Sequence, residues 1–357
     1  MKDERGQALI IVLLIVAILV AVVVEFAYTT RVNIDITMRM RDSIQAKRIA
    51  VAALEIEKGL LTADLSISPN ADYPVYGELN KNAQLWSQIA NFPLPVMIKD
   101  KSIGIMRGLI SDESGKFDLN ALIGSDTITA NQTLDGICRR LFEKLKLDPN
   151  TVDAIEDWID SDELPRPYGA ESEYYEGLDP AYRAKDAPLD SITELKMIKG
   201  IDEKTFNVLM GKTDVNGKPL LQPADAMDSP LFTVFPKYYD PNSPFKINVN
   251  TASPVLLAAM YSLDDSQVQD IISTREQTPF LSIGDFTNEL TKIGVDLNNP
   301  QVQAVNGYID VKSNYFSVDG IGIIEDGVTY IVRAVYYRNR QTRNFTLLYW
   351  REEPFNN

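Results

Sequence analysis

The sequence predicts an α+β protein: a long N-terminal helix on an antiparallel β-meander, with a large α-helical domain inserted into the chain. Three observations support this fold class. Residues 7–58 contain no glycine or proline, the last fifty residues read as three strands, and the middle of the chain is rich in helix-capping motifs. A length of 357 residues favours two or three structural units over a single core.

The N-terminal helix is expected to begin inside a membrane. Residues 8–24 are 17 consecutive apolar residues, and a helix rising ~1.5 Å per residue then reaches about the thickness of a bilayer core. Farther along, Ile49, Ala53, Ile56 and Leu60 recur at helical spacing and predict an apolar face packed on a globular head. We expect one helix over residues 7–60, with residues 7–24 in the membrane.

Two alternatives compete for the N-terminal stretch. A secretory signal peptide needs a net-positive front and a small-residue cleavage site, whereas the charges of residues 2–5 cancel and residues 24–26 read VEF. A plain signal anchor needs only the apolar run itself, so it stays open on this evidence.

The composition excludes several classes of function. The formal net charge of −15 argues against nucleic acid as the main partner, because phosphate binding needs clustered Lys and Arg. The chain has no histidine, which removes the usual general base and the commonest zinc ligand. Its one cysteine, Cys138, lies in a helical pattern and is expected in the core.

The remaining chain divides by pattern into a head and an insertion. Residues 316–324, 328–337 and 344–350 predict three antiparallel strands joined by two hairpins. Helical patterns with capping signals at Ser191, Ser253, Asp264 and Ser282 fill the middle of the chain. We therefore expect a head formed by residues 61–130 and 304–357, and an inserted helical domain over residues 131–303.

Residues 153–190 carry 12 acidic and 3 basic side chains, a net charge of −9. Crowded carboxylates either have raised pKa values or bind a cation, and oxygen ligands without His or Cys favour calcium. A solvated acidic face and a pair of catalytic carboxylates are the alternatives. The residues predicted to bind the cation are Asp157, Asp160, Asp162, Glu171 and Glu173.

Taken together, these features resemble the type IV pilin-like superfamily, and within it the minor pseudopilin K family of type II secretion. The short polar leader ends at Gly6, and Ile11 stands where most pilins carry glutamate at the fifth mature position. The stretches DWIDSD (157–162), GAE (169–171) and INVNTAS (247–253) are similar to that family. The resemblance implies that prepilin peptidase cuts between Gly6 and Gln7, leaving residues 1–6 as a leader.

The resemblance also implies a function and a set of partners. It implies a structural protein, not an enzyme, that helps initiate or cap the pseudopilus at its tip, for export of folded proteins across the outer membrane. The implied partners are I- and J-type minor pseudopilins, the major pseudopilin, prepilin peptidase, the assembly platform and inner-membrane lipid, with no nucleic acid. The implied location is the bacterial inner membrane, crossed once, with the C-terminal head in the periplasm. The inserted domain is expected to hold structural calcium.

Two functions of other classes are weighed against this one. Residues 192–209 and 247–286 resemble helix-hairpin-helix modules, which suggests a membrane-anchored DNA-uptake or competence protein. The second of these segments, however, has Ser-Leu-Asp-Asp (262–265) where a phosphate-binding hairpin offers glycine amides. The acidic stretch suggests a carboxylate-dependent hydrolase as the other alternative.

Overall fold

The computed structural model describes residues 4–73, 93–218, 231–236, 245–324 and 327–355. Its longest element is α1, Glu4–Ile67, a single uninterrupted helix of 64 residues. The helix starts before and ends after the predicted range of 7–60. Residues 1–3 of the predicted leader lie outside the described residues.

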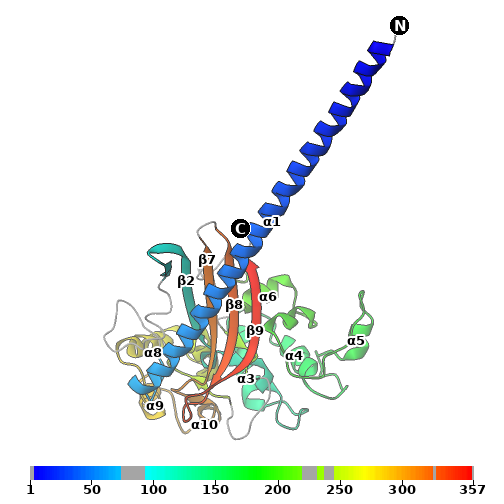
Figure 1. Ribbon diagram of the computed structural model, residues 1–357. Helices are drawn as coiled ribbons and strands as arrows, with labels where there is room; N and C mark the ends of the chain where they lie inside the picture. The colour runs from blue at the N-terminus through cyan, green and yellow to red at the C-terminus, as the bar shows by residue number, and fades with distance from the viewer. Residues whose placement is uncertain (1–3, 74–92, 219–230, 237–244, 325–326, 356–357) are drawn as a thin grey trace.

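The two halves of α1 have different surroundings. In Figure 1 the N-terminal half stands clear of the head, and the C-terminal half lies along it. Within the described chain, α1 is the one helix long and apolar enough to cross a membrane, and none of its apolar window is buried by protein. By length and composition, this half of α1 therefore fits a single-pass membrane anchor.

The head is built on a five-stranded antiparallel sheet with the order β1-β2-β7-β8-β9. The strands are β1 (Leu94–Ile98), β2 (Lys101–Asp112), β7 (Tyr315–Ile324), β8 (Thr329–Arg338) and β9 (Phe345–Phe355). The last three are the predicted C-terminal strands, joined as consecutive hairpins. The predicted long helix on an antiparallel meander is therefore confirmed.

The C-terminal half of α1 packs closely on β2 and β7. At Gly320 and Gly322 a Cβ atom would overlap the carbonyl oxygens of Ala50 and Ala46, so the helix backbone rests directly on the strand. Ile49 and Ala53 of the predicted apolar face are buried and Leu60 is half-buried, but the prediction is wrong at Ile56. Ile56 is exposed, and the residue beside it, Glu57, is buried instead, with its carboxylate over Gly108 of β2.

The helical insertion leaves the sheet after Asp112 and returns at Tyr315, and Asp112 pairs with the next residue, Phe316, in the β2–β7 register. It starts earlier and ends later than the predicted 131–303, because side chains of residues 117–123 and 305–311 belong to its core. Figure 1 shows α3, α8, α9 and α10 around the end of the sheet remote from the N-terminus of α1. Its helices are η1 (Glu113–Gly115), η2 (Leu119–Leu122), α3 (Gln132–Lys144), α4 (Thr151–Ile159), α5 (Ser172–Glu176), η3 (Ile192–Met197), α6 (Glu203–Leu209), α7 (Pro254–Tyr261), α8 (Asp265–Gln277), α9 (Ile283–Lys292) and α10 (Pro300–Asn306).

Local sequence signals account for many of these elements. Ser253, Asp264 and Ser282 cap α7, α8 and α9 as predicted, the last two with complete capping boxes. Ser191 also forms a capping box, but the helix it opens is the 3₁₀ helix η3. Two short parallel pairs, β3 (Phe117–Asp118) with β4 (Phe232–Thr233) and β5 (Ile247–Asn248) with β6 (Ile309–Asp310), tie distant segments together.

A buried polar network joins the insertion to the head. The side-chain amide of Asn248 donates to the Asp72 carbonyl at 2.9 Å, to the Asp112 carboxylate at 3.3 Å and to Ser313 Oγ at 2.7 Å. Thr251 Oγ1 donates to the same Asp112 carboxylate at 2.6 Å, and Arg338 donates to Asp72 at 2.7 Å. The INVNTAS stretch therefore lies at the junction between the insertion and the head. We call the hydrogen bonds among Asp72, Asp112, Asn248, Thr251, Ser313 and Arg338 the neck network.

Candidate metal centre

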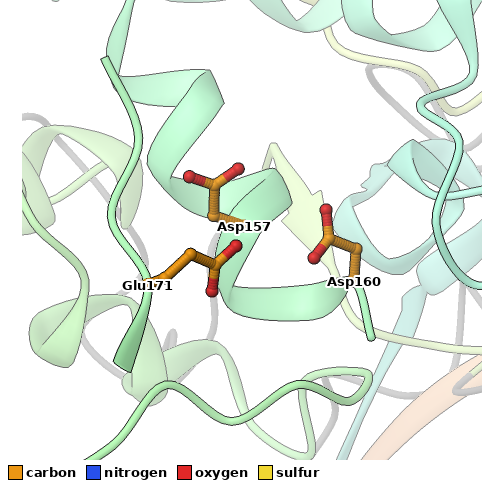
Figure 2. A group of neighbouring side chains, drawn as sticks. All are labelled: Asp157, Asp160 and Glu171. Carbon is orange, nitrogen blue, oxygen red and sulfur yellow. The ribbon is translucent and has the colours of Figure 1, made fainter. Parts of the chain in front are cut away.

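Three of the five predicted acidic ligands meet at the C-terminal end of α4. Asp157 lies in the last turn of this helix, Asp160 is its C-terminal cap, and Glu171 precedes the first turn of α5. One carboxylate oxygen from each lies within 4.8 Å of the other two. Figure 2 shows the three side chains as neighbours, with Glu171 on a segment that runs beside the helix of Asp157.

The carboxylates of this centre are buried, which does not fit a solvated acidic face. Asp157, Asp160 and Glu171 are 0%, 1% and 4% exposed. Burial raises the pKa of Asp160 to about 6 and that of Glu171 to about 8, and neighbouring acidic groups add to both shifts. The pKa of Asp157 is also raised by burial, although its hydrogen bonds to Arg166 oppose the shift.

One arginine runs along one side of the centre. Arg166 Nη1 lies 2.6 Å from Asp157 Oδ1 and also pairs with Asp160 Oδ2. Its Nε atom lies 2.9 Å from Glu156 Oε2. A single guanidinium therefore joins three carboxylates of α4 and its cap through one oxygen each.

Backbone groups and aromatic rings hold the loop between α4 and α5 against α4. The Arg166 amide donates to Asp157 and the Tyr168 amide donates to Asp153 Oδ2 at 3.1 Å. A Cβ at Gly169 would overlap Asp157 Oδ2, so this close approach requires glycine. Below the loop, Tyr175 packs edge-on against Trp158 with 5.2 Å between ring centroids.

The donor set suits a hard cation. Asp160 Oδ1 and both oxygens of Glu171 are buried and, among the described residues, have no hydrogen-bond partner. Leaving ionised oxygens buried without a partner is unfavourable, and a cation bound among them would satisfy them. Carboxylate oxygens without nitrogen or sulfur ligands favour Ca²⁺ or Mg²⁺ over a transition metal.

The other two predicted ligands lie outside this group. The Asp162 carboxylate accepts a hydrogen bond from the Leu164 amide at 2.8 Å, as in an Asx turn. Glu173 is exposed in the first turn of α5, where a carboxylate stabilises the N-terminal end of the helix. Each of these two acids therefore has a local role.

Sequence reasoning missed Arg166, Glu156 and Gly169. Arg166 is the first basic residue after Asp153 in the acidic stretch, and that position was the available signal. Burial raises the pKa of Glu156 to about 8. The whole of α4 from Val152 to Ile159 is buried, so its acidic face is an interior one.

The N-terminal residues singled out by the sequence lie on α1. Gly6 and Gln7 are in its first two turns, and Ile11 follows with its side chain exposed, 58% of its surface being accessible. An apolar residue at this position adds no charge to the segment predicted to cross the membrane.

Comparison with known proteins adds a consistent family signal. Models of type II secretion system (T2SS) protein K match residues 115–211 and 247–307. A type II secretion system protein K from Pseudomonas aeruginosa is 30% identical over 215 residues, covering 59% of this chain and 56% of the relative. Proteins of the same name from Klebsiella pneumoniae and Aeromonas hydrophila are 27% and 24% identical, and the matches span 79% and 90% of their lengths.

A solved structure extends the likeness to the fold. The crystal structure of the GspK-GspI-GspJ complex from the enterotoxigenic Escherichia coli type 2 secretion system contains a chain that matches with a TM-score of 0.66. The match covers 89% of this chain and 99% of that chain at 17% sequence identity. The fold described above is therefore similar to a known structure over most of the chain.

Proposed function

We propose that this chain, as a member of the type II secretion system protein K family, is a structural subunit at the pseudopilus tip, not an enzyme. There it helps initiate or cap assembly for the export of folded proteins across the outer membrane. The observation that carries the proposal is the position of the insertion, whose helices α8, α9 and α10 lie at the membrane-distal end of the sheet (Figure 1). Subunits of a helical filament stack along its axis, so this body would obstruct any subunit above it.

The position in the filament is tested by counting. The chain is labelled on an exposed residue of the insertion, such as Asn216, and pseudopili are imaged beside filaments labelled on the major pseudopilin. One label at one end of each filament is expected. Labels spaced along the filament would contradict the tip position.

The membrane half of α1 supports a single-pass anchor in the inner membrane with the head in the periplasm. Prepilin peptidase would cut between Gly6 and Gln7, and the new N-terminus would be methylated. Ile11 supports a starting position in the filament, because a first subunit needs no buried carboxylate to pair with a subunit already assembled.

Intact mass and N-terminal sequencing of the protein from its own cells test the processing between Gly6 and Gln7. A start at Gln7 is expected, and a start at Met1 would contradict processing.

Partners of this chain are expected to be I- and J-type minor pseudopilins, with the major pseudopilin and the inner-membrane platform in later assembly. The related solved complex contains GspK, GspI and GspJ. On this chain, an open apolar groove of about 740 Å³ runs between α1 and the β1–β2 hairpin, with Met40, Ile44, Ile98 and Met106 among its lining residues. The groove continues toward the exposed apolar half of α1, so the N-terminal helix of a partner anchored in the same membrane would lie alongside it.

The groove is tested with two variants on the same helix. Ile44→Glu places a charge inside the groove, and Ile56→Glu places one on an exposed position outside its lining. Ile44→Glu is expected to abolish co-purification with the I-type partner, while Ile56→Glu retains it. Equal retention by both variants would rule out the groove as the contact.

The cation site is expected to hold structural calcium through Asp157, Asp160 and Glu171. The support is the buried, unpartnered oxygens of Asp160 and Glu171.

A bound ion stabilises the folded state in proportion to the logarithm of its concentration over Kd. Calcium should therefore raise the Tm of the full chain relative to chelator. Asp160→Asn should lose this response and Glu173→Gln should keep it; a calcium-insensitive wild type would contradict the site.

A further inference from the structure

The guanidinium of Arg166 selects which carboxylate oxygens remain for a cation. It binds Asp157 through Oδ1, Asp160 through Oδ2 and Glu156 through Oε2. The opposite oxygen of Asp160 has no partner, and neither does either oxygen of Glu171, whereas Glu156 is not a member of the three-carboxylate group. The two oxygens of Asp160 thus have separate roles, one bound by Arg166 and the other left for the cation.

Arg166 does not occupy the place of the cation. A group that replaced the ion would contact all three carboxylates of the centre, whereas Glu171 is left without any hydrogen-bond partner. Even so, oxygens of Asp157, Asp160 and Glu171 are already gathered within 4.8 Å of one another. Like charges this close repel, so the positive charge at their side is what allows them to stay together.

We propose that Arg166 is the positioning residue of the cation site. The inference rests on the calcium site proposed above. By holding one oxygen on each of Glu156, Asp157 and Asp160, the guanidinium fixes the rotation of these carboxylates, and the free oxygen of Asp160 faces the ion with those of Glu171. The role needs the planar fork of arginine, since its several N–H groups diverge at fixed angles and the single ammonium of lysine does not.

The test measures terbium(III) binding to the full chain in detergent, with Trp158 as the excited donor and calcium as the competitor. Arg166→Gln is expected to weaken terbium and calcium binding roughly 10–100-fold, the usual effect of losing a group that orients metal ligands. Luminescence lifetimes in H₂O and D₂O should also report at least one more ion-bound water than in the wild type, because a carboxylate has turned away. Charge alone predicts the opposite, since removing a positive group strengthens attraction for a cation.

Two further variants separate positioning from charge and from folding. Arg166→Lys keeps the charge and should still bind more weakly and with more water. Arg183→Gln removes an exposed arginine that pairs with the exposed Glu163 and Glu176, and should bind as the wild type does. Unchanged or tighter binding by Arg166→Gln, or full binding by Arg166→Lys, would overturn the proposal. A wild-type chain that binds neither ion would instead refute the calcium site, and this inference with it.

Discussion

At the residue scale, the identity of Gly169 is determined by its close contact with Asp157. A methyl group there would overlap the Asp157 carboxylate, whereas one at Gly177, in the same acidic segment, would meet only ordinary contacts. Gly169→Ala should therefore displace Asp157, weaken calcium binding and lower the Tm of the calcium-loaded chain. Gly177→Ala should change neither quantity, and calorimetry of the two variants with and without chelator compares them. Equal calcium binding by both would contradict this reading.

The buried carboxyl of Glu57 makes a prediction about pH. Burial between α1 and the sheet raises its pKa to about 7, and its Oε2 atom has no hydrogen-bond partner. The folded state therefore binds this proton more tightly than the unfolded state does. The resulting stability is complete below the ordinary glutamate pKa and is lost as the pH rises through about 7.

Glu57→Gln removes this titration and keeps the shape of the side chain. From about pH 5 to about pH 8 the Tm of the wild type should fall more than that of Glu57→Gln. Glu55→Gln is the control, because Glu55 is an exposed neighbour on the same helix that pairs with Lys58. Parallel Tm curves for wild type and Glu57→Gln would show that Glu57 does not titrate in this range.

At the scale of elements, the sequence predicted which helices and strands form better than it predicted how they meet. The break-free run to Lys58 and the alternating C-terminal strands were enough to predict α1 and three strands of the sheet. Hydrophobic periodicity placed Ile56 inside, where the structure has Glu57. The inner face of α1 is set by the shape of the sheet, which has glycines beneath it, and that information lies in distant residues such as Gly108 and Gly320.

The contact between α1 and β7 makes the prediction at this scale. Gly320→Ala places a methyl group against the Ala50 carbonyl, and such overpacking costs about 1–3 kcal/mol. Gly59→Ala is the control. Gly59 lies on α1, as Ala50 does, and a Cβ added there would have nothing within 4 Å. Replacing a glycine by alanine inside a helix stabilises the folded protein by about 0.5–1 kcal/mol. Thermal unfolding should show opposite shifts, and a stabilised Gly320→Ala would mean that the helix does not rest on this strand.

At the scale of the whole molecule, sequence reasoning recognised an insertion and an acidic site but missed how each is joined to its surroundings. Acidic clustering was enough to find Asp157, Asp160 and Glu171. It missed Arg166, because composition does not say which base faces which acid. The boundaries of the insertion were drawn at changes in helical pattern, whereas the chain leaves the sheet at Asp112, where β2 still pairs with β7. Long-range pairing of this kind depends on residues far apart in the chain.

The neck network predicts that the insertion and the head unfold as one unit. Asn248 is completely buried and its amide binds Asp72, Asp112 and Ser313, which belong to segments on both sides of the insertion. Asn248→Ala would leave buried acceptors without their donor, at a cost of about 1–3 kcal/mol. It would also weaken the contact between the insertion, which carries the candidate cation site, and the sheet packed on α1.

Calorimetry of the full chain tests this coupling. The wild type should unfold in one transition whose midpoint falls when calcium is chelated. In Asn248→Ala the transition should separate into two, of which only the one belonging to the insertion responds to chelator. Asn216→Ala, at an exposed turn of the same insertion, should behave as the wild type. A single calcium-sensitive transition in Asn248→Ala would mean that the backbone connections at the neck transmit the coupling without the buried amide.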